Sequence, residues 1–173
     1  LDFIKPNELY LSNDLLMDYK NLIIIKSLTK FFAIPGARIG YGLCSNNEII
    51  NEINKIIVPW SVNVIASEAI IQGLKEKDYI DKSIVYVKNE KEYLYSSLKE
   101  IESLKVFEPS VNFIMFKLLI DLDLKGELIK RKILIRSCSN YIGLNENFYR
   151  IAVRTSEENK IIINEIRNIL FDK

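Results

Sequence analysis

Three side chains capable of covalent and anion-binding chemistry lie close together near the start of the chain. Ser27, Lys30 and Arg38 fall within residues 26–42, directly after an apolar run at residues 22–25. A neutral amine condenses with an aldehyde, while a guanidinium fork and a hydroxyl donate hydrogen bonds to phosphate oxygens. Apolar neighbours on both sides of Lys30 would desolvate its amine and favour the neutral form. The spacing predicts that the three side chains converge on one ligand, and solvated charges beside an apolar turn are the alternative.

Two arginines near the end of the chain form a second candidate anion site. Arg136 follows the apolar run at residues 133–135, and Arg150 lies in the alternating segment 149–153. Two guanidinium forks are enough for a substrate that carries both a carboxylate and a phosphate. The alternative is that both arginines are exposed cross-strand charges with no ligand.

The residue types that are absent exclude several classes of site. The chain contains no histidine, which excludes Ser-His-Asp and Cys-His nucleophile mechanisms and most zinc sites. Its two cysteines, Cys44 and Cys138, have no metal-ligand spacing and form no disulfide framework, as is typical of a reducing compartment. Any chemistry must therefore use lysine, arginine, tyrosine or carboxylate side chains.

Composition and charge favour a globular chain that acts on small molecules. The 173 residues are 49% hydrophobic and 27% charged, with 24 Lys and Arg against 23 Asp and Glu. This balance gives no electrostatic reason to expect nucleic acid or an acidic membrane surface as the partner. No apolar run approaches the ~20 residues of a membrane span, and the first residues lack the features of a signal peptide. We expect a cytoplasmic protein, and a first residue other than methionine suggests a fragment or a processed product.

The first half of the chain predicts an α/β arrangement with Lys30 just beyond a strand. The β-branched run at residues 22–25 predicts a short strand buried on both faces, as in a parallel sheet, and residues 40–44 predict another strand. Ligand sites of α/β sheets lie at the carboxyl ends of strands, which is where Lys30 falls. Helices are expected from Ser12 or Asn13 to about residue 19, over residues 46–57 before Pro59, and over residues 62–74.

The second half predicts a small α+β domain that follows a long helix. Residues 78–101 have the apolar spacing of one amphipathic helix, which is long enough to join two domains. Strands are then expected over residues 111–119, 133–136 and 149–153, with a short helix over 127–131 and a last helix opened by Thr155 or Ser156. We therefore predict a large-domain part over residues 1–104 and a small α+β domain over residues 105–173.

The first reactive segment resembles the lysine motif of fold-type I pyridoxal-phosphate enzymes. That motif is S-x-[ST]-K followed eight residues later by Arg, and the chain matches it at Ser27, Lys30 and Arg38. The resemblance implies that pyridoxal 5'-phosphate is the cofactor, that Lys30 holds it as a Schiff base and later shuttles a proton, and that Ser27 and Arg38 bind its phosphate. It also implies an α/β fold class: the C-terminal part of an aminotransferase-like large domain plus a small α+β C-terminal domain.

The second segment is similar to the threonine-phosphate decarboxylase and histidinol-phosphate aminotransferase family. The similarity rests on Ile-Leu-Ile-Arg-Ser-Cys-Ser-Asn-Tyr-Ile-Gly-Leu at residues 133–144 and Phe-Tyr-Arg-Ile-Ala-Val-Arg at residues 148–154. It implies that Arg150 holds the substrate α-carboxylate and that Arg136 helps to bind the substrate phosphate, while Arg154 receives no role. Residues 59–63 are also similar to this family, where they lie near the active-site mouth, although a capping turn with a buried Trp60 is the simpler interpretation.

Within this family, the detail of residues 136–144 favours the decarboxylase. The implied reaction is decarboxylation of L-threonine O-3-phosphate to aminopropanol phosphate in cobalamin biosynthesis, so the partner is a phosphorylated amino acid. Histidinol-phosphate or a related amino-acid aminotransferase is the alternative, because the same arginines serve both reactions. A non-catalytic half-domain that acts in interaction or dimerisation is the alternative from another class.

The resemblance covers nearly the whole chain but only the second half of such an enzyme. It places the aspartate of the pyridine nitrogen upstream of Leu1, together with the stacking aromatic residue, an asparagine and the Gly-rich phosphate loop. We therefore expect this chain alone to be inactive, because the partner of the electron sink lies outside it. A homodimer is expected, because the site of this family is completed across subunits.

Overall fold

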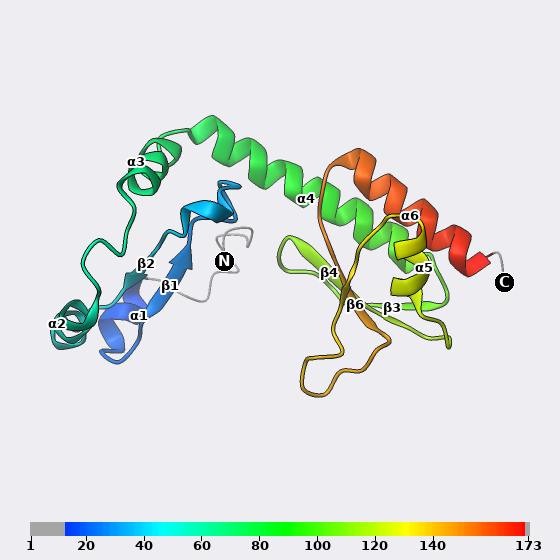
Figure 1. Ribbon diagram of the computed structural model, residues 1–173, viewed down its shortest axis with the longest axis horizontal. Coiled ribbons are helices and arrows are strands. Elements are labelled where there is room, and N and C mark those ends of the chain that lie inside the picture. Colours follow the sequence, from blue (N-terminus) through cyan, green and yellow to red (C-terminus); the bar gives the residue numbers. More distant parts are fainter. Residues whose placement is uncertain (1–12, 172–173) are drawn as a thin grey trace. The chain divides into compact units, whose positions relative to one another are not determined.

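The computed structural model describes residues 13–171, which fall into two compact units (Figure 1). One unit comprises the described residues up to Ile80, and the other begins at Asp81. This division falls near the start of the long helix α4 (Lys77–Lys99), whereas the predicted domain boundary after residue 104 lies beyond its end. The boundary after residue 104 stays a prediction. Among the described residues, no helix is long and apolar enough to cross a membrane.

The first unit combines short helices with a two-stranded antiparallel ladder. Strand β1 (Ile24–Ser27) pairs with β2 (Gly40–Leu43) so that Ser27 lies opposite Gly40. The expected helices and strands of this half form, but the first strand lies two residues later than the predicted 22–25. Ser12, one of the two expected caps, lies outside the described residues. The other elements are α1 (Asn13–Asp18), the 3-10 helix η2 (Pro35–Ala37), α2 (Asn47–Ile56) and α3 (Val64–Gly73).

Strand β1 corrects the prediction of a parallel strand that is buried on both faces. Ile24 is buried, but Ile25 is 82% exposed, and the partner strand runs antiparallel. Successive side chains of a strand point to opposite faces, so a β-branched run is fully buried only where both faces of the sheet are covered. The described part of the chain covers the Ile24 side of this ladder and leaves the Ile25 side open.

Asparagine caps determine where α2 and α3 begin. The Asn46 side chain accepts a hydrogen bond from the Glu48 amide at 2.9 Å, and Asn63 accepts one from the Ile65 amide at 2.8 Å. An asparagine at this position satisfies amide groups that have no partner inside the helix. The caps explain why both helices form close to their predicted positions.

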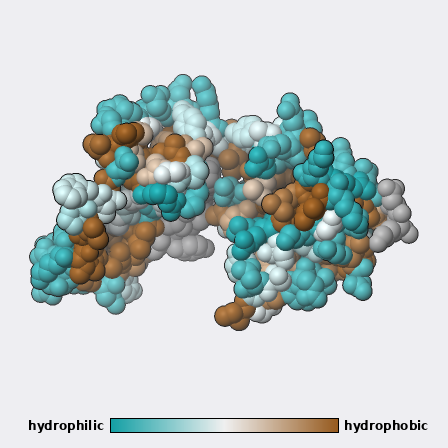
Figure 2. Space-filling model, viewed as in Figure 1, coloured by the Kyte–Doolittle hydropathy of each residue, from teal (hydrophilic) through white to brown (hydrophobic). Residues whose placement is uncertain are grey.

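The first unit exposes many large apolar side chains. Figure 2 shows hydrophobic atoms at the surface beside α2 and over α3. The expectation of a buried Trp60 is wrong, because this residue is 97% exposed and has a left-handed φ of +59°. The most exposed aliphatic residues of this unit are Ile25, Ile56, Val58, Val64 and Ile65. Its apolar residues therefore contribute little to a core within the described chain.

The second unit is built on a four-stranded antiparallel sheet in the order β3-β4-β6-β5. Side chains alternate along β4 and β6 between buried and more accessible positions, so one face of the sheet lines the core and the other is open. The strands are β3 (Leu104–Val106), β4 (Phe113–Leu118), β5 (Arg136–Ser137) and β6 (Phe148–Ala152).

Helices α4, α5 (Leu124–Lys130) and α6 (Ser156–Phe171) complete the core of the second unit (Figure 1). Phe116 is fully buried, and its ring lies 5.9 Å from the Tyr149 ring, centroid to centroid. The buried helix residues recur at intervals of three or four, which puts them on one side of each helix. The core includes Leu94, Leu98, Leu104, Ile114, Phe116, Leu118, Leu124, Leu128, Tyr149, Ile151, Ile163 and Ile166.

The boundaries of two elements in this unit differ from their predictions. Residues 133–136 were expected to form a strand, but β5 contains only Arg136 and Ser137, because the Ile133 amide donates to the Leu128 carbonyl and closes α5. Helix α5 begins three residues before its expected start, because Asp123 caps it by accepting a hydrogen bond from the Gly126 amide. The short strand β3 was not predicted, since three residues carry almost no periodic signal.

Candidate functional site

A tight turn after β1 brings together the polar groups of Ser27, Thr29 and Lys30. The Ser27 and Thr29 hydroxyls lie 3.0 Å apart, and the Lys30 amine donates to the Ser27 hydroxyl at 3.4 Å. Thr29 is buried, so its side chain holds the turn on its inner side. Backbone hydrogen bonds from Phe32 to Leu28 and from Ile34 to Thr29 close the turn. The predicted proximity of Ser27 and Lys30 is present.

The Lys30 side chain is exposed, which corrects the expectation that apolar neighbours desolvate its amine. Phe31 and Phe32 pack against each other with ring centroids 5.2 Å apart, and the Phe32 ring stacks on Tyr79 at 6.1 Å. The Tyr79 hydroxyl donates to the Phe31 carbonyl at 3.2 Å. The rings therefore pack with one another instead of covering the amine, which leaves Lys30 open to an incoming ligand.

Arg38 adopts a left-handed backbone conformation directly after η2. Its φ is +49° and its ψ is +51°, a region that is unfavourable for residues with a Cβ. Its side chain is exposed, and Nη1 donates to the Pro35 carbonyl at 3.1 Å. The Leu28 amide donates to the Ile39 carbonyl at 3.3 Å, which joins the Arg38 loop to the turn that carries Lys30.

Gly40 determines how closely β2 approaches β1. A Cβ on Gly40 would lie 2.5 Å from the Lys26 carbonyl oxygen, closer than real Cβ contacts allow. The absence of a side chain therefore lets the two strands pair in register up to Ser27. Among the described contacts, Arg38 bonds to neither Ser27 nor Lys30, so the convergence of all three residues on one ligand stays a prediction.

Arg136 and Arg150 lie directly opposite each other on β5 and β6. Residues that face each other across a sheet share one face, so the two guanidinium groups emerge on the same side. The Arg150 guanidinium lies over the Phe113 ring at 4.5 Å from its centroid. Within residues 13–171, neither arginine forms an ion pair with an acidic side chain. The arrangement can receive an anion, and its role in substrate binding stays a prediction.

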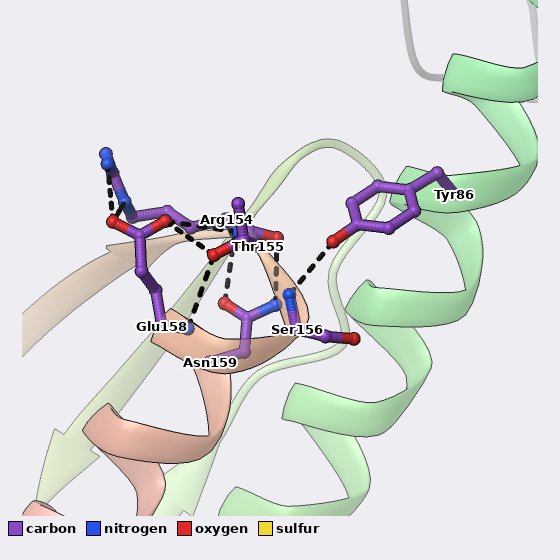
Figure 3. A network of polar contacts seen from close by, with 6 residues as sticks. All are labelled: Tyr86, Arg154, Thr155, Ser156, Glu158 and Asn159. Carbon is purple, nitrogen blue, oxygen red and sulfur yellow. Dashed lines mark hydrogen bonds and ion pairs between the residues drawn. The ribbon is translucent and has the colours of Figure 1, made fainter.

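Arg154 follows strand β6, which carries Arg150, but the charge of Arg154 is neutralised by a carboxylate (Figure 3). Its guanidinium lies 2.7 Å from Glu158 in an ion pair. Hydrogen bonds from Arg154 and from Thr155 lower the pKa of Glu158 to about 2. The Arg154 side chain therefore has its own acidic partner, in contrast to Arg136 and Arg150.

Sequence reasoning missed a buried polar network at the start of α6. Asn159 is almost fully buried, and its amide nitrogen donates to Glu90 at 2.7 Å and to the Arg154 carbonyl at 3.0 Å. The Tyr86 hydroxyl accepts a hydrogen bond from the Ser156 amide at 2.9 Å (Figure 3). These bonds join α4 to the turn between β6 and α6. No local sequence signal identifies them, because the partners lie far apart in the chain.

Comparison with known families gives a match over most of the chain. Residues 4–166 match the family model described as aminotransferase class I and II. The threonine-phosphate decarboxylase of Salmonella typhimurium is 33% identical over 156 residues, which are 90% of this chain and 43% of that protein. The adenosylcobalamin biosynthesis bifunctional protein CobDQ of Leptospira interrogans is 43% identical over 157 residues, which are 88% of this chain and 18% of that protein.

Solved structures agree with the sequence match. The histidinol-phosphate aminotransferase of Clostridium acetobutylicum superposes with a TM-score of 0.91 and 32% identity, over 98% of this chain and 51% of that one. The histidinol-phosphate aminotransferase of Sinorhizobium meliloti, solved in complex with pyridoxal-5'-phosphate, has the same fold, with a TM-score of 0.83 and 19% identity over 99% of this chain and 46% of that one. The chain thus spans at most about half the length of these relatives. The predicted fold class and family are confirmed.

Proposed function

Because this chain belongs to the class I and II aminotransferase family, we propose that it is the lysine-bearing part of a pyridoxal-phosphate enzyme that decarboxylates L-threonine O-3-phosphate. The product would be aminopropanol phosphate, an intermediate of cobalamin biosynthesis. The observation that carries the proposal is the accessible Lys30 amine, 3.4 Å from the Ser27 hydroxyl in the turn after β1. The relatives from Salmonella and Leptospira support the decarboxylase and the pathway.

The donor set on this turn fits pyridoxal 5'-phosphate, which the family match supports as the cofactor. Lys30 would hold it through its amine, while the Ser27 hydroxyl and the Arg38 guanidinium would bind its phosphate. When bound, this cofactor supplies an electron sink for the bond that breaks at the substrate Cα. The exposed Lys30 amine can reach an aldehyde, and it can afterwards carry a proton to or from the substrate carbon.

The arginine pair of the second unit supplies the proposed substrate contacts. Arg150, held over the Phe113 ring, would bind the α-carboxylate through its guanidinium fork, and the exposed Arg136 beside it would bind the phosphate. An anion between two like charges relieves their repulsion, so the pair favours a ligand with more than one negative charge. A phosphorylated amino acid has that charge pattern.

A histidinol-phosphate aminotransferase is the second candidate. The 32% identity and the TM-score of 0.91 to the Clostridium acetobutylicum enzyme favour it. The two reactions differ in which substrate bond is held perpendicular to the cofactor ring, and the same arginines serve either outcome. We further propose that the active protein is a homodimer and that residues 1–104 and 105–173 are its two domain parts.

The test is the visible absorbance of the native polypeptide with pyridoxal phosphate, before and after Lys30→Ala, with Lys20→Ala as an exposed control. A visible band that disappears only in Lys30→Ala supports the cofactor role of this residue. Release of carbon dioxide from threonine phosphate, with no requirement for a 2-oxo acid, supports the decarboxylase. Turnover only after a 2-oxo acid is added would instead establish the aminotransferase. A colourless protein with no turnover would favour a non-catalytic interaction domain.

A further inference from the structure

The charged residues of the second unit's sheet are all cations and all lie on one face. Its four strands contain Lys105, Lys117, Arg136 and Arg150, and they contain no aspartate or glutamate. Lys105 lies opposite Lys117, and Arg136 lies opposite Arg150. Lys117 also lies opposite Phe148, two residues before Arg150 on the same strand, so both pairs share one face. The chain as a whole has a net charge of only +1, so this is a local segregation of charge.

The two lysines rest on a stacked pair of aromatic rings. The Lys105 amine lies 5.9 Å from the Phe107 ring centroid, and the Lys117 amine lies 5.4 Å from that of Phe148. The Phe107 and Phe148 rings stack with their centroids 6.1 Å apart and an interplanar angle of 21°. A cation over the face of a ring is attracted by the ring's quadrupole, which limits the directions that its side chain takes. Because Lys105 and Lys117 also lie opposite each other in the β3–β4 ladder, their side chains can reach one ligand.

This arrangement has an electrostatic cost that no acidic side chain of residues 13–171 offsets by an ion pair. Like charges directly opposite each other in a sheet are destabilising. Lysines elsewhere in the chain, such as Lys55 and Lys130, have a glutamate three residues away as ion-pair partner. An edge-strand lysine prevents aggregation, which accounts for Lys105 on β3. It does not account for Lys117, because β4 is an interior strand.

The Arg150 guanidinium is directed away from Lys117. Arg150 lies opposite Met115, and its guanidinium leans over Phe113, two residues before Met115 on β4. Lys117 lies two residues after Met115 and rests over Phe148. The guanidinium therefore lies toward the Phe113 end of β4, whereas Lys117 stays level with Phe148 toward the other end. Two separate positions for an anion result.

We propose that Lys105 and Lys117 form a second anion-binding site, distinct from the arginine pair, whose ligand is the phosphate group of a small organic phosphate. A phosphate dianion can accept hydrogen bonds from both amines and neutralise both charges. The half-buried rings of Phe107 and Phe148 give the site an apolar floor, which reduces the screening of this attraction by water. The inference does not rest on the proposed decarboxylase function.

The first test is a titration of the purified chain with inorganic phosphate, followed by the NMR shifts of the β3 and β4 amides. Sodium chloride at equal ionic strength gives the baseline. We expect saturable shifts. The affinity for phosphate should fall by about tenfold or more in Lys105→Gln and in Lys117→Gln, because each variant loses a charge-assisted hydrogen bond. Lys117→Arg should retain binding. Lys99→Gln is the matched control, since Lys99 is an exposed lysine over the Tyr95 ring but belongs to helix α4 and not to the sheet. Arg150→Gln should leave the shifts next to Lys105 and Lys117 unchanged and remove only those that phosphate causes near the arginine pair.

The second test is thermal unfolding with and without phosphate. Without phosphate, Lys117→Gln should melt at a higher temperature than Lys99→Gln, because both variants lose a lysine–ring contact but only Lys117→Gln removes a lysine repulsion. Phosphate should raise its melting temperature less than that of the unmodified chain. Phosphate effects no larger than those of chloride would overturn the site. Loss of the amide shifts in Arg150→Gln would show one site instead of two. A Lys117→Gln chain that melts at a lower temperature than Lys99→Gln would show that Lys117 stabilises the fold and does not serve a ligand.

Discussion

At the scale of single residues, Arg150 and Arg154 differ in the groups that lie beside their guanidinium groups. Arg154 has a carboxylate 2.7 Å away, and Arg150 has an aromatic ring and another arginine. A guanidinium that already has a carboxylate gains little from a ligand, while one that faces a like charge gains more. Lys30 resembles Arg150 in this respect, because its amine contacts the Ser27 hydroxyl and not a carboxylate.

Replacing Lys30 tests covalent chemistry separately from charge. Lys30→Arg keeps the positive charge but removes the primary amine that condenses with an aldehyde. We expect loss of the visible absorbance band with pyridoxal phosphate and a fall in kcat on the order of 10³-fold in the native polypeptide. Retention of the band in Lys30→Arg would contradict the assigned role, since a guanidinium does not form this bond.

Replacing the arginines tests which of them bind substrate. Arg150→Gln should raise the KM for threonine phosphate by about 10- to 100-fold, because a charge-assisted hydrogen bond contributes about 1.5–3 kcal/mol. Arg136→Gln should act in the same direction. Arg154→Gln is the control and should leave KM nearly unchanged, because Glu158 already holds that side chain. Steady-state kinetics measure all three, and an equal effect of Arg154→Gln would remove the distinction.

At the scale of elements, the start of α6 is fixed by reciprocal hydrogen bonds between Thr155 and Glu158. The Glu158 amide donates to the Thr155 hydroxyl oxygen at 3.3 Å, and the Glu158 carboxylate accepts from the Thr155 amide at 3.3 Å. This is the capping box, which satisfies two backbone donors at a helix start. The nearby Asn159 bonds to Glu90 on α4, so the cap and the neighbouring helix are linked.

The cap predicts a specific dependence of stability on pH. The folded chain lowers the pKa of Glu158 from 4.5 to about 2, so folding favours the ionised carboxylate. Its contribution is fully present above pH 4.5 and is lost as the pH falls toward 2. Over this range, the urea midpoint of the unmodified chain should fall more than that of Glu158→Gln. The difference should be small because the group is exposed. Parallel curves for the two proteins would contradict the prediction.

The β1–β2 ladder predicts different results for two glycines of one strand. Gly40→Ala should destabilise the ladder by about 1–3 kcal/mol, because its Cβ would meet the Lys26 carbonyl oxygen at 2.5 Å. Gly42→Ala is the matched control, since a Cβ there has no atom within 4 Å. Amide hydrogen exchange at Leu28, which bonds to Ile39, should accelerate only in Gly40→Ala. Equal protection of the Leu28 amide in both variants would show that the two strands can move apart without loss of stability.

At the scale of the whole molecule, the two units differ in how much core each contains. The second unit buries aromatic and aliphatic residues from strands β3, β4 and β6 and from three helices in one cluster. Among the described residues of the first unit, the buried apolar ones are Leu16, Ile24, Ala66 and Ile70, while its helix α2 buries none of its residues. Apolar burial is the main favourable term in folding, so the two units should differ in stability.

Hydrogen exchange of the isolated chain should reveal this difference directly. Amides of β4 and β6, which line the buried cluster, should exchange more slowly than amides of β1 and β2. With rising urea, protection should disappear first in the first unit. Equal protection at every urea concentration would instead show that the chain unfolds as one cooperative body and that the exposed apolar residues do not weaken the first unit.

The sequence alone determined the elements with strong local signals and the family. Helices α2, α4 and α6 follow from apolar spacing and caps, since both are set by residues within a few positions of each other. The motif around Ser27, Lys30 and Arg38 identified the lysine turn, because a reactive site needs given residue types at a given spacing. These features depend on neighbours in the chain, which the sequence contains.

Only the tertiary structure decided which side chains are covered and which charges have partners. The exposure of Lys30 and Ile25 opposes what their apolar neighbours predicted, and Trp60 is exposed where a buried ring was expected, because burial depends on elements that are distant in sequence. The register that places Lys105 opposite Lys117 and the contact of Asn159 with Glu90 join positions far apart in the chain. Local periodicity carries no information about such pairings, because strand register and helix packing are set by the whole core.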